Sequence, residues 1–134
     1  MSINDAAMRQ LLTKYRRVAV VGLSDKTNRP SYVASKYMLE HGFEVIPVNP
    51  GHKSIMGLTC YPDLRSIPTR VDIVDLFQRA ERVPLFVDDA IAIGARVLWM
   101  QLDIVNEAAA AKAREAGLEV VMDRCIKIEY ARLF

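Results

Sequence analysis

The chain has 134 residues, with 18 basic and 16 acidic side chains that give a formal net charge of +2. This length fits one domain and excludes a TIM barrel of about 250 residues or a complete two-domain dehydrogenase or ligase. Hydrophobic residues make up 51% and charged residues 25% of the chain, which is typical of a globular domain. Because the charge is small and of mixed sign, it gives no reason to expect nucleic acid or a membrane as a partner.

The sequence has no feature of export or of zinc binding. Residues 1–5 contain no basic stretch that leads into an apolar run, and no apolar run approaches the roughly 20 residues that span a bilayer. Cys60 and Cys125 are far apart, and neither His41 nor His52 has a second His or Cys at ligand spacing. We expect a cytoplasmic protein with reduced thiols.

Apolar residues alternate along the chain between helical spacing and short continuous runs typical of buried parallel strands. The predicted elements, in chain order, are a helix over 3–15, a strand over 18–22, a helix over 31–41, a strand over 43–48, a strand over 71–77, a helix over 83–94, a strand over 97–100, a helix over 106–116, a strand over 118–122 and a helix over 126–133. The stretch 52–68 is less regular, with one short helical turn expected near 62–64. Asn106 is placed to cap a helix, and Gly42 and Gly117 are placed to end two others.

Strands that alternate with helices in this way predict βαβ units and a parallel sheet with helices on both faces. We therefore predict one α/β domain over 1–134, a Rossmann-like, doubly wound parallel sheet of five strands. The expected spatial order is 3-2-1-4-5, counting strands along the chain. Ligands of such sheets bind beyond the carboxyl ends of the strands, where the strand order reverses.

The loop after the first predicted strand has features of a phosphate site. Gly22 allows a tight turn, and Pro30 with Ser31 marks the start of the next helix, where Ser31 is a candidate N-cap. A helix N-terminus offers unpaired N–H groups to a phosphate.

Two basic side chains of the same loop, Lys26 and Arg29, add full positive charge. The loop does not complete the GxGxxG motif, because Ser24 stands where the second glycine would be. We interpret the loop as a binding loop, with an ordinary exposed loop as the alternative.

The second predicted strand ends at Asn49 and Pro50 without the acidic residue that an NAD site uses to bind the adenosine ribose. His52 and Lys53 follow. A neutral residue followed by basic ones suits a phosphorylated ribose, as in NADP and coenzyme A, or a nearby polyphosphate. A simple turn is the alternative.

Further candidates follow the third and fourth predicted strands. Phe77 is placed either to flank an adenine or to join the core, and Arg79 either to bind a phosphate in a bidentate way or to lie on the surface. Gln101 and Asn106 share a rim and suit a polar group, whereas Trp99 is expected to pack in or beside the sheet.

Catalytic motifs are missing from the sequence. It contains neither a GxSxG nucleophile elbow nor a GxxxxGK[ST] phosphate loop. Asp72 and Asp75 flank a strand but have no His or metal cluster beside them. Cys125 next to Arg124 is interpreted as a structural thiol, with a somewhat activated thiol as the alternative. We therefore identify no catalytic residue, and a binding protein is favoured over an enzyme.

Several segments together resemble the small bacterial CoA-binding protein family, stand-alone versions of the domain found at the N-terminus of the succinyl-CoA synthetase α subunit. They are residues 20–24 (VVGLS), 29–31 (RPS), 45–50 (VIPVNP), 99–102 (WMQL) and 121–129 (VMDRCIKIE). The resemblance covers nearly the whole chain and implies a Rossmann-like CoA-binding domain in the cytoplasm. It implies a site formed by Gly22, Ser24, Arg29, Ser31, Asn49, Pro50 and the loop from Phe77 to Arg79.

The sequence departs from the family pattern at two positions. Gln78 stands where an Arg is expected, which removes one phosphate contact, and Asp103 stands where a Gly is expected, which adds a negative charge near the rim. In the synthetase, the CoA domain is followed by a ligase domain that carries the phosphorylated histidine. Because this chain ends at Phe134, soon after the fifth predicted strand, no ligase activity is expected.

The resulting hypothesis is a protein that binds CoA or an acyl-CoA. The start of the helix at Pro30 and Ser31 would hold the pyrophosphate, with Arg29 closing over it, and the adenine would lie near Asn49 and Pro50 or near Phe77. Candidates for the 3′-phosphate remain open among Lys26, His52, Lys53 and Arg79. The alternatives are an NADP-linked oxidoreductase, an acyl-CoA-handling catalyst, and a regulatory protein whose response to CoA is read by a partner.

Overall fold

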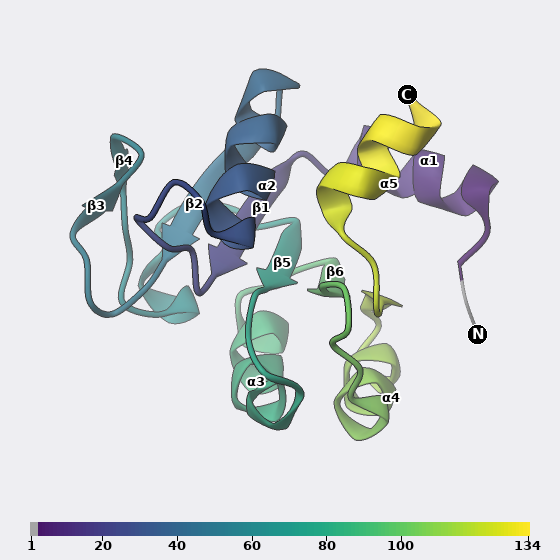
Figure 1. The fold of residues 1–134 in the computed structure, drawn as a ribbon. Coiled ribbons are helices and arrows are strands. Elements are labelled where there is room, and N and C mark those ends of the chain that lie inside the picture. Colours follow the sequence, from purple (N-terminus) through teal and green to yellow (C-terminus); the bar gives the residue numbers. More distant parts are fainter. Residues whose placement is uncertain (1–2) are drawn as a thin grey trace.

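The computed structural model describes residues 3–134, and within this range five parallel strands form one sheet with helices on both faces (Figure 1). The strands of the sheet are β1 (Arg17–Val21), β2 (Glu44–Val48), β5 (Ile73–Leu76), β6 (Val97–Met100) and β7 (Glu119–Val121). The helices are α1 (Asp5–Lys14), α2 (Pro30–Glu40), α3 (Pro84–Ala92), α4 (Glu107–Glu115) and α5 (Ile126–Leu133). The predicted fold class is confirmed, and each predicted helix or strand ends within one or two residues of the observed one.

The connection between β2 and β5 contains a hairpin that the sequence pattern did not predict and a short helical turn that it did. A two-stranded hairpin, β3 (Ser54–Ile55) with β4 (Leu58–Thr59), is followed by the 3-10 turn η1 (Leu64–Ser66). The Asp63 side chain accepts a hydrogen bond from the Ser66 N–H at 2.9 Å, which confirms the short helical turn expected near 62–64. A second 3-10 turn, η2 (Ala80–Arg82), precedes α3.

The predicted strand order is wrong. The observed order is β2-β1-β5-β6-β7, so β5, the third strand along the chain, lies beside β1 and not outside β2. Pro47 of β2 has no N–H to donate, which suits an edge strand. The outer edge of β2 is taken by Tyr61, whose N–H donates to the Pro47 carbonyl at 3.0 Å and whose carbonyl accepts from the Asn49 N–H at 2.9 Å. The strand order therefore reverses between β1 and β5.

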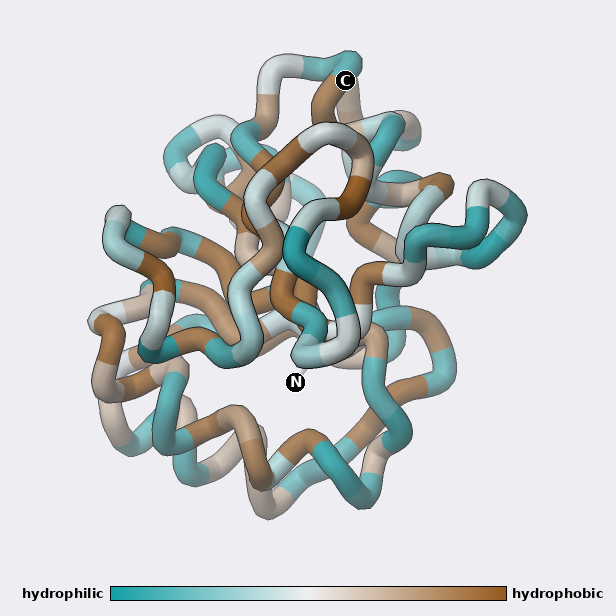
Figure 2. The backbone as a smooth tube through the Cα atoms, turned by 90° about the vertical axis from the view of Figure 1, so that its left-hand side faces the viewer, coloured by the Kyte–Doolittle hydropathy of each residue, from teal (hydrophilic) through white to brown (hydrophobic). Residues whose placement is uncertain are grey.

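Two hydrophobic layers hold the helices to the sheet. Helices α1, α2 and α5 cover one face, and α3 and α4 cover the other (Figure 1). Because successive strand residues point to opposite faces, Val18 and Val20 pack in the first layer and Ala19 and Val21 in the second. Hydrophobic segments accordingly run through the interior between the sheet and the helices (Figure 2).

Trp99 of β6 is fully buried in the first layer, and its Nε1 donates to the carbonyl of Arg124 at 2.7 Å. Its expected packing against the sheet is confirmed. This bond also fixes the chain just before α5. Within residues 3–134, no helix is long and apolar enough to cross a membrane.

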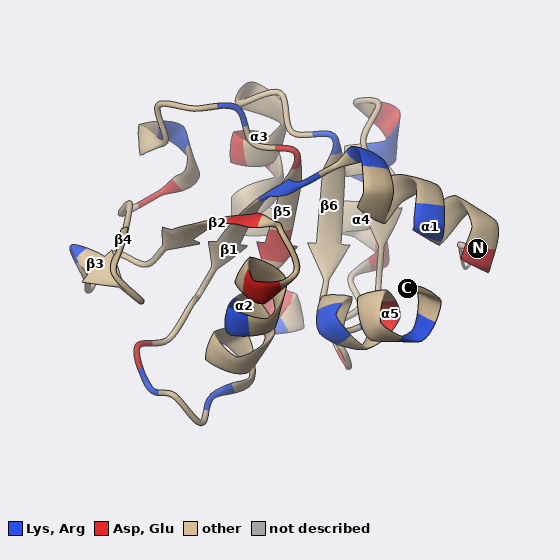
Figure 3. Ribbon diagram, turned by 90° about the horizontal axis from the view of Figure 1, so that it is seen from above, with Lys and Arg blue, Asp and Glu red and all other residues tan. Residues whose placement is uncertain are grey.

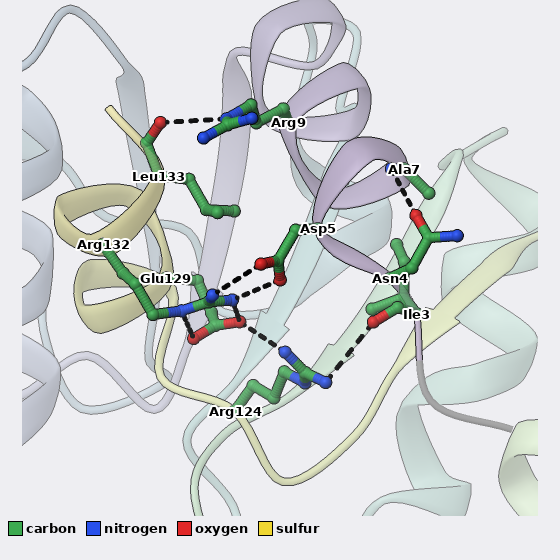
Figure 4. A network of polar contacts seen from close by, with 9 residues as sticks. All are labelled: Ile3, Asn4, Asp5, Ala7, Arg9, Arg124, Glu129, Arg132 and Leu133. Carbon is green, nitrogen blue, oxygen red and sulfur yellow. Dashed lines mark hydrogen bonds and ion pairs between the residues drawn. The ribbon is translucent and has the colours of Figure 1, made fainter.

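A polar network joins the first and last helices (Figure 4). The Arg132 guanidinium donates to both oxygens of Asp5, at 3.0 and 2.9 Å, and also to Glu129. Arg124 donates to Glu129 at 2.6 Å and to the carbonyl of Ile3. Burial raises the pKa of Glu129, but the hydrogen bonds from Arg132 and Arg124 outweigh it and hold that pKa below its usual value. The network therefore holds α5 and the residues before it against α1.

Candidate functional site

A cavity of about 820 Å³ opens at the carboxyl ends of the strands, around the reversal point between β1 and β5. The predicted site residues that line it are Gly22, Ser24, Lys26, Arg29, Pro30, Ser31, Phe77 and Arg79. They come from the loop between β1 and α2 and from the loop after β5. The fold thus brings the candidates from the first and third predicted strand ends into one place.

Four predicted site residues lie outside this lining: Asn49, Pro50, His52 and Lys53. Asn49 has a supporting role, because its Nδ2 donates to the carbonyl of Leu23 at 3.0 Å and its Oδ1 accepts from the Gly51 N–H at 2.9 Å. It therefore forms the turn after β2 and contacts the loop after β1. Direct contact of these four residues with a ligand remains a prediction.

Gly22 occupies a position that only glycine fits without strain. Its φ is +87°, and a Cβ there would lie 2.5 Å from the carbonyl oxygen of Phe77 and 2.7 Å from Nε2 of Gln78. Its N–H donates to the Val48 carbonyl at 2.9 Å. The absence of a side chain lets the ends of β1 and β5 approach each other at the floor of the cavity.

The start of α2 differs from the prediction in one respect. The N-cap is Arg29, not Ser31, because Pro30, which lacks an N–H, takes the first helical position and places Ser31 inside the helix. Ser31 is buried, and its Oγ accepts a hydrogen bond from the Ser24 N–H at 3.0 Å, which shapes the loop. No side chain caps this helix, so its first N–H groups are available to an anion.

Three exposed cations line the cavity onto which the N-terminus of α2 opens: Lys26, Arg29 and Arg79. The basic segments of the loop between β1 and α2 are blue in Figure 3, where this loop extends away from the sheet. Among residues 3–134, none of the three cations forms an ion pair. This end of the cavity is therefore positively charged and uncompensated.

A buried polar pair lies beside the floor of the cavity. Asp75 of β5 is fully buried, its Oδ1 accepts a hydrogen bond from Nε2 of Gln101, and its Oδ2 has no partner among residues 3–134. Burial raises the pKa of Asp75 to about 7, although the hydrogen bond from Gln101 acts in the opposite direction. Gln101 is only 4% exposed, lines the cavity, and its Oε1 accepts no hydrogen bond from the described residues. The cavity thus presents a buried acceptor to a ligand.

The two aspartates of the third predicted strand do not act as a pair. Asp72 lies at the opposite end of β5, where its Oδ2 accepts from the N–H groups of Arg16 and Arg17, at 3.2 and 3.1 Å, and its Oδ1 pairs with Arg70. Asp72 therefore joins neighbouring chain segments, whereas Asp75 lies beside the cavity. Among residues 3–134, no group of His, Cys, Asp and Glu is arranged to hold a metal ion.

The rest of the lining comes from the loop after β6 and the start of α5. Leu102, Ile104, Cys125 and Ile128 form an apolar side, and Leu102 and Ile128 are 54% and 53% exposed. Sequence reasoning placed Gln101 near the site but did not include these apolar residues. The sequence signal that could have predicted this apolar side is the presence of two large apolar residues, Leu102 and Ile104, shortly after a buried strand.

Of two residues expected at the rim, Asp103 lines the cavity and Asn106 does not. Asp103, at the rim, has a φ of +68°, a conformation that favours glycine, and its N–H donates to Asp123 at 2.7 Å. Asn106, which we expected at the same rim, is not part of the lining. Its Oδ1 caps α4 through the Ala109 N–H at 3.0 Å, as predicted, and its Nδ2 donates to the carbonyl of Ala80 at 2.9 Å.

A sequence model of the CoA binding domain matches residues 16–131. The chain belongs to this family. The resemblance inferred from the sequence is confirmed, and family membership agrees with the position of the cavity at the strand ends.

Relatives of similar length match this chain over nearly all of it. The uncharacterized protein YneT of Bacillus subtilis is 39% identical over 126 residues, which cover 94% of this chain and 93% of that protein. The solved structure of a hypothetical protein from Pyrococcus horikoshii OT3 is 41% identical with a TM-score of 0.95, over 98% of this chain and 92% of that one.

A longer relative is an enzyme. Acetate–CoA ligase [ADP-forming] II of Archaeoglobus fulgidus is 34% identical over 71 residues, which are 52% of this chain but 10% of the ligase. The similarity therefore relates this chain to one portion of a much longer enzyme and does not cover the rest of that enzyme.

Proposed function

We propose that this protein binds coenzyme A or an acyl-CoA in the cavity at the carboxyl ends of the strands and has no ligase activity of its own. The observation that carries the proposal is that one end of this cavity is basic and the other end is apolar, in a chain of the CoA binding domain family. Neither histidine of the chain lines the cavity, so no phosphorylatable histidine faces the proposed ligand.

The order of the strands supports one orientation of the ligand. The basic residues follow β1 and β5, whereas the apolar residues follow β6 and β7. Neighbouring strands lie about 4.8 Å apart, so β1 and β7 are separated by roughly 14 Å. We place the phosphates of CoA at the start of α2, near Lys26, Arg29 and Arg79, and the thiol end of the pantetheine arm near Leu102 and Ile128.

Calorimetric titration of CoA into the wild type and an Arg29→Ala variant tests this placement. One charge-assisted hydrogen bond is worth roughly 1.5–3 kcal/mol, so the variant should bind CoA about tenfold to a hundredfold more weakly. Arg96→Ala is the matched control, because the exposed Arg96 immediately precedes β6, at the amino end of the strands. Equal affinities of wild type and Arg29→Ala for CoA would show that Arg29 does not contribute to CoA binding.

Thermal shift with CoA, dephospho-CoA, NAD and NADP distinguishes the proposal from its main alternative, an NADP-linked oxidoreductase. CoA should stabilise the protein most, and dephospho-CoA less, because the loss of the 3′-phosphate removes one partner of the basic side chains. Stabilisation by NADP alone would refute CoA binding and support the oxidoreductase.

A further inference from the structure

The two cysteines of the chain have different surroundings. Cys60 is 7% exposed, its Sγ donates to the carbonyl of Asn49 at 3.4 Å, and burial raises the pKa of its thiol. Cys125 is half-buried and lines the cavity described above. Of the two thiols, only that of Cys125 is therefore placed beside a ligand bound in that cavity.

Cys125 also lies where two cavities meet. A second cavity of about 610 Å³ shares Leu102, Cys125 and Ile128 with the first and includes Arg114. A molecule that reacts at Cys125 thus has space on both sides of the sulfur. One half can occupy the proposed CoA cavity, and the other half can extend into the second cavity.

The position of Cys125 in the chain is well defined. It is the N-cap residue of α5, a helix of eight residues, and among residues 3–134 no side-chain hydrogen bond caps this helix. The attacking species in thiol–disulfide exchange is the thiolate. The bonds that Arg124 makes to Glu129 and Trp99 fix the chain directly before Cys125.

Gln101 gives a separate indication that the same cavity takes a polar ligand. This side chain is nine-tenths buried or more, lines the cavity with Cys125, and has an Oε1 without a partner among the described residues. Its orientation is fixed by the bond from Nε2 to Asp75. The pantetheine arm of CoA carries amide N–H groups close to its thiol, which match an acceptor at this place.

We propose that Cys125 is a modification site that takes up one CoA moiety from a CoA disulfide bound across the two cavities. This inference rests on the proposed binding of CoA. The Cys125 thiolate attacks one sulfur of the CoA disulfide, the bond between the two CoA sulfurs breaks, and a bond between Cys125 and one CoA forms. The other CoA leaves as a thiolate and takes up the proton that Cys125 released, so one disulfide replaces another without a further oxidant.

The test is incubation of the full chain with CoA disulfide, followed by intact-mass and peptide mass spectrometry under non-reducing conditions. We expect a gain of one CoA moiety, located on Cys125. Cys125→Ser should abolish this gain, and Cys60→Ser, the matched control, should retain it. Because binding raises the local concentration of the reagent, the reaction should be at least roughly tenfold faster than with oxidised glutathione.

Two further outcomes separate this proposal from CoA binding itself. Equal rates with CoA disulfide and oxidised glutathione, or an adduct on Cys60, would overturn the proposal. Calorimetry with reduced CoA is run on the wild type in the presence of a reducing agent. Binding there, combined with no adduct from CoA disulfide, refutes the role of Cys125 and leaves the proposed function standing, whereas the absence of binding refutes the proposed function.

Discussion

Replacing Asp75 by Asn should stabilise the fold at neutral and alkaline pH. The wild-type carboxyl is fully buried with a single hydrogen bond, from Gln101, and burial raises its pKa from 3.8 to about 7. Asn has nearly the same shape, can accept the same bond through its oxygen, and never ionises. Asp75→Asn therefore removes the cost of a buried charge and keeps the packing.

The sign and size of the effect follow from the two pKa values. Below about pH 3 the carboxyl is protonated in the folded and unfolded states, so ionisation makes no difference to stability. As the pH rises, the unfolded chain releases this proton first, and the unfolding free energy falls until the folded Asp75 also ionises near pH 7. Each pKa unit corresponds to about 1.4 kcal/mol, so the stability of Asp75→Asn relative to wild type should increase by about 3 kcal/mol between pH 5 and pH 8.

Urea unfolding of both proteins at several pH values between 5 and 8 measures this difference. The comparison cancels the titration of all groups that the two proteins share. Asp72→Asn is the matched control, because Asp72 lies at the other end of β5 and its ionised form accepts two backbone N–H groups and pairs with Arg70. That variant should be less stable than wild type at pH 8. A difference between wild type and Asp75→Asn that stays constant or falls as the pH rises would refute the reasoning.

Three further substitutions test other parts of the structure. Gly22→Ala should lower the unfolding free energy, measured by urea unfolding, more than Gly94→Ala does. Both glycines have a positive φ, which costs an alanine roughly 1–2 kcal/mol. Of the two, only Gly22→Ala would also place a Cβ against the backbone of another segment. Glu129→Gln should destabilise the fold by about 3 kcal/mol at pH 7, since it removes the buried carboxylate that pairs with Arg124 and Arg132. Because the folded pKa of Glu129 is lowered, the wild-type advantage over this variant should be full above about pH 4.5 and decline in more acidic solution. Asp103→Gly should strengthen CoA binding about twofold by removing a negative charge at the rim, and 1 M NaCl in the calorimeter should abolish the gain.

Local sequence signals predicted the elements and much of the candidate site. The alternation of apolar patterns placed the helices and strands, and Gly22 with Pro30 marked the loop whose Lys26 and Arg29 line the cavity. These features depend on neighbouring residues in the chain. Pro30 also marked the helix start, but its place at the first helical position meant that Ser31 could not be the N-cap.

Features that depend on contacts between distant segments were harder to predict. The apolar side of the cavity combines Leu102 and Ile104 with Cys125 and Ile128, and their proximity depends on β6 and β7 being neighbours. The roles of Asn49 and Asp75 depend likewise on Leu23 and Gln101, which lie 26 residues away in each case. The supporting bond of Asn49 to Leu23 could therefore not be read from residue type, and a direct contact of Asn49 with a ligand stays a prediction.

The strand order decides whether the basic residues can act together. In the predicted order, 3-2-1-4-5, the end of β5 would lie beyond β2, about 9–10 Å from the end of β1. Arg79 would then be far from the start of α2. In the observed order β5 pairs directly with β1, and the missing side chain of Gly22 lets the loop after β5 lie against the end of β1. Pro47, which makes β2 an edge strand, was the sequence signal for this arrangement. Pro47 in the edge strand and Gly22 directly after β1 therefore have the same consequence. Both allow β5 to lie beside β1, so that Arg79 and Arg29 line the same cavity.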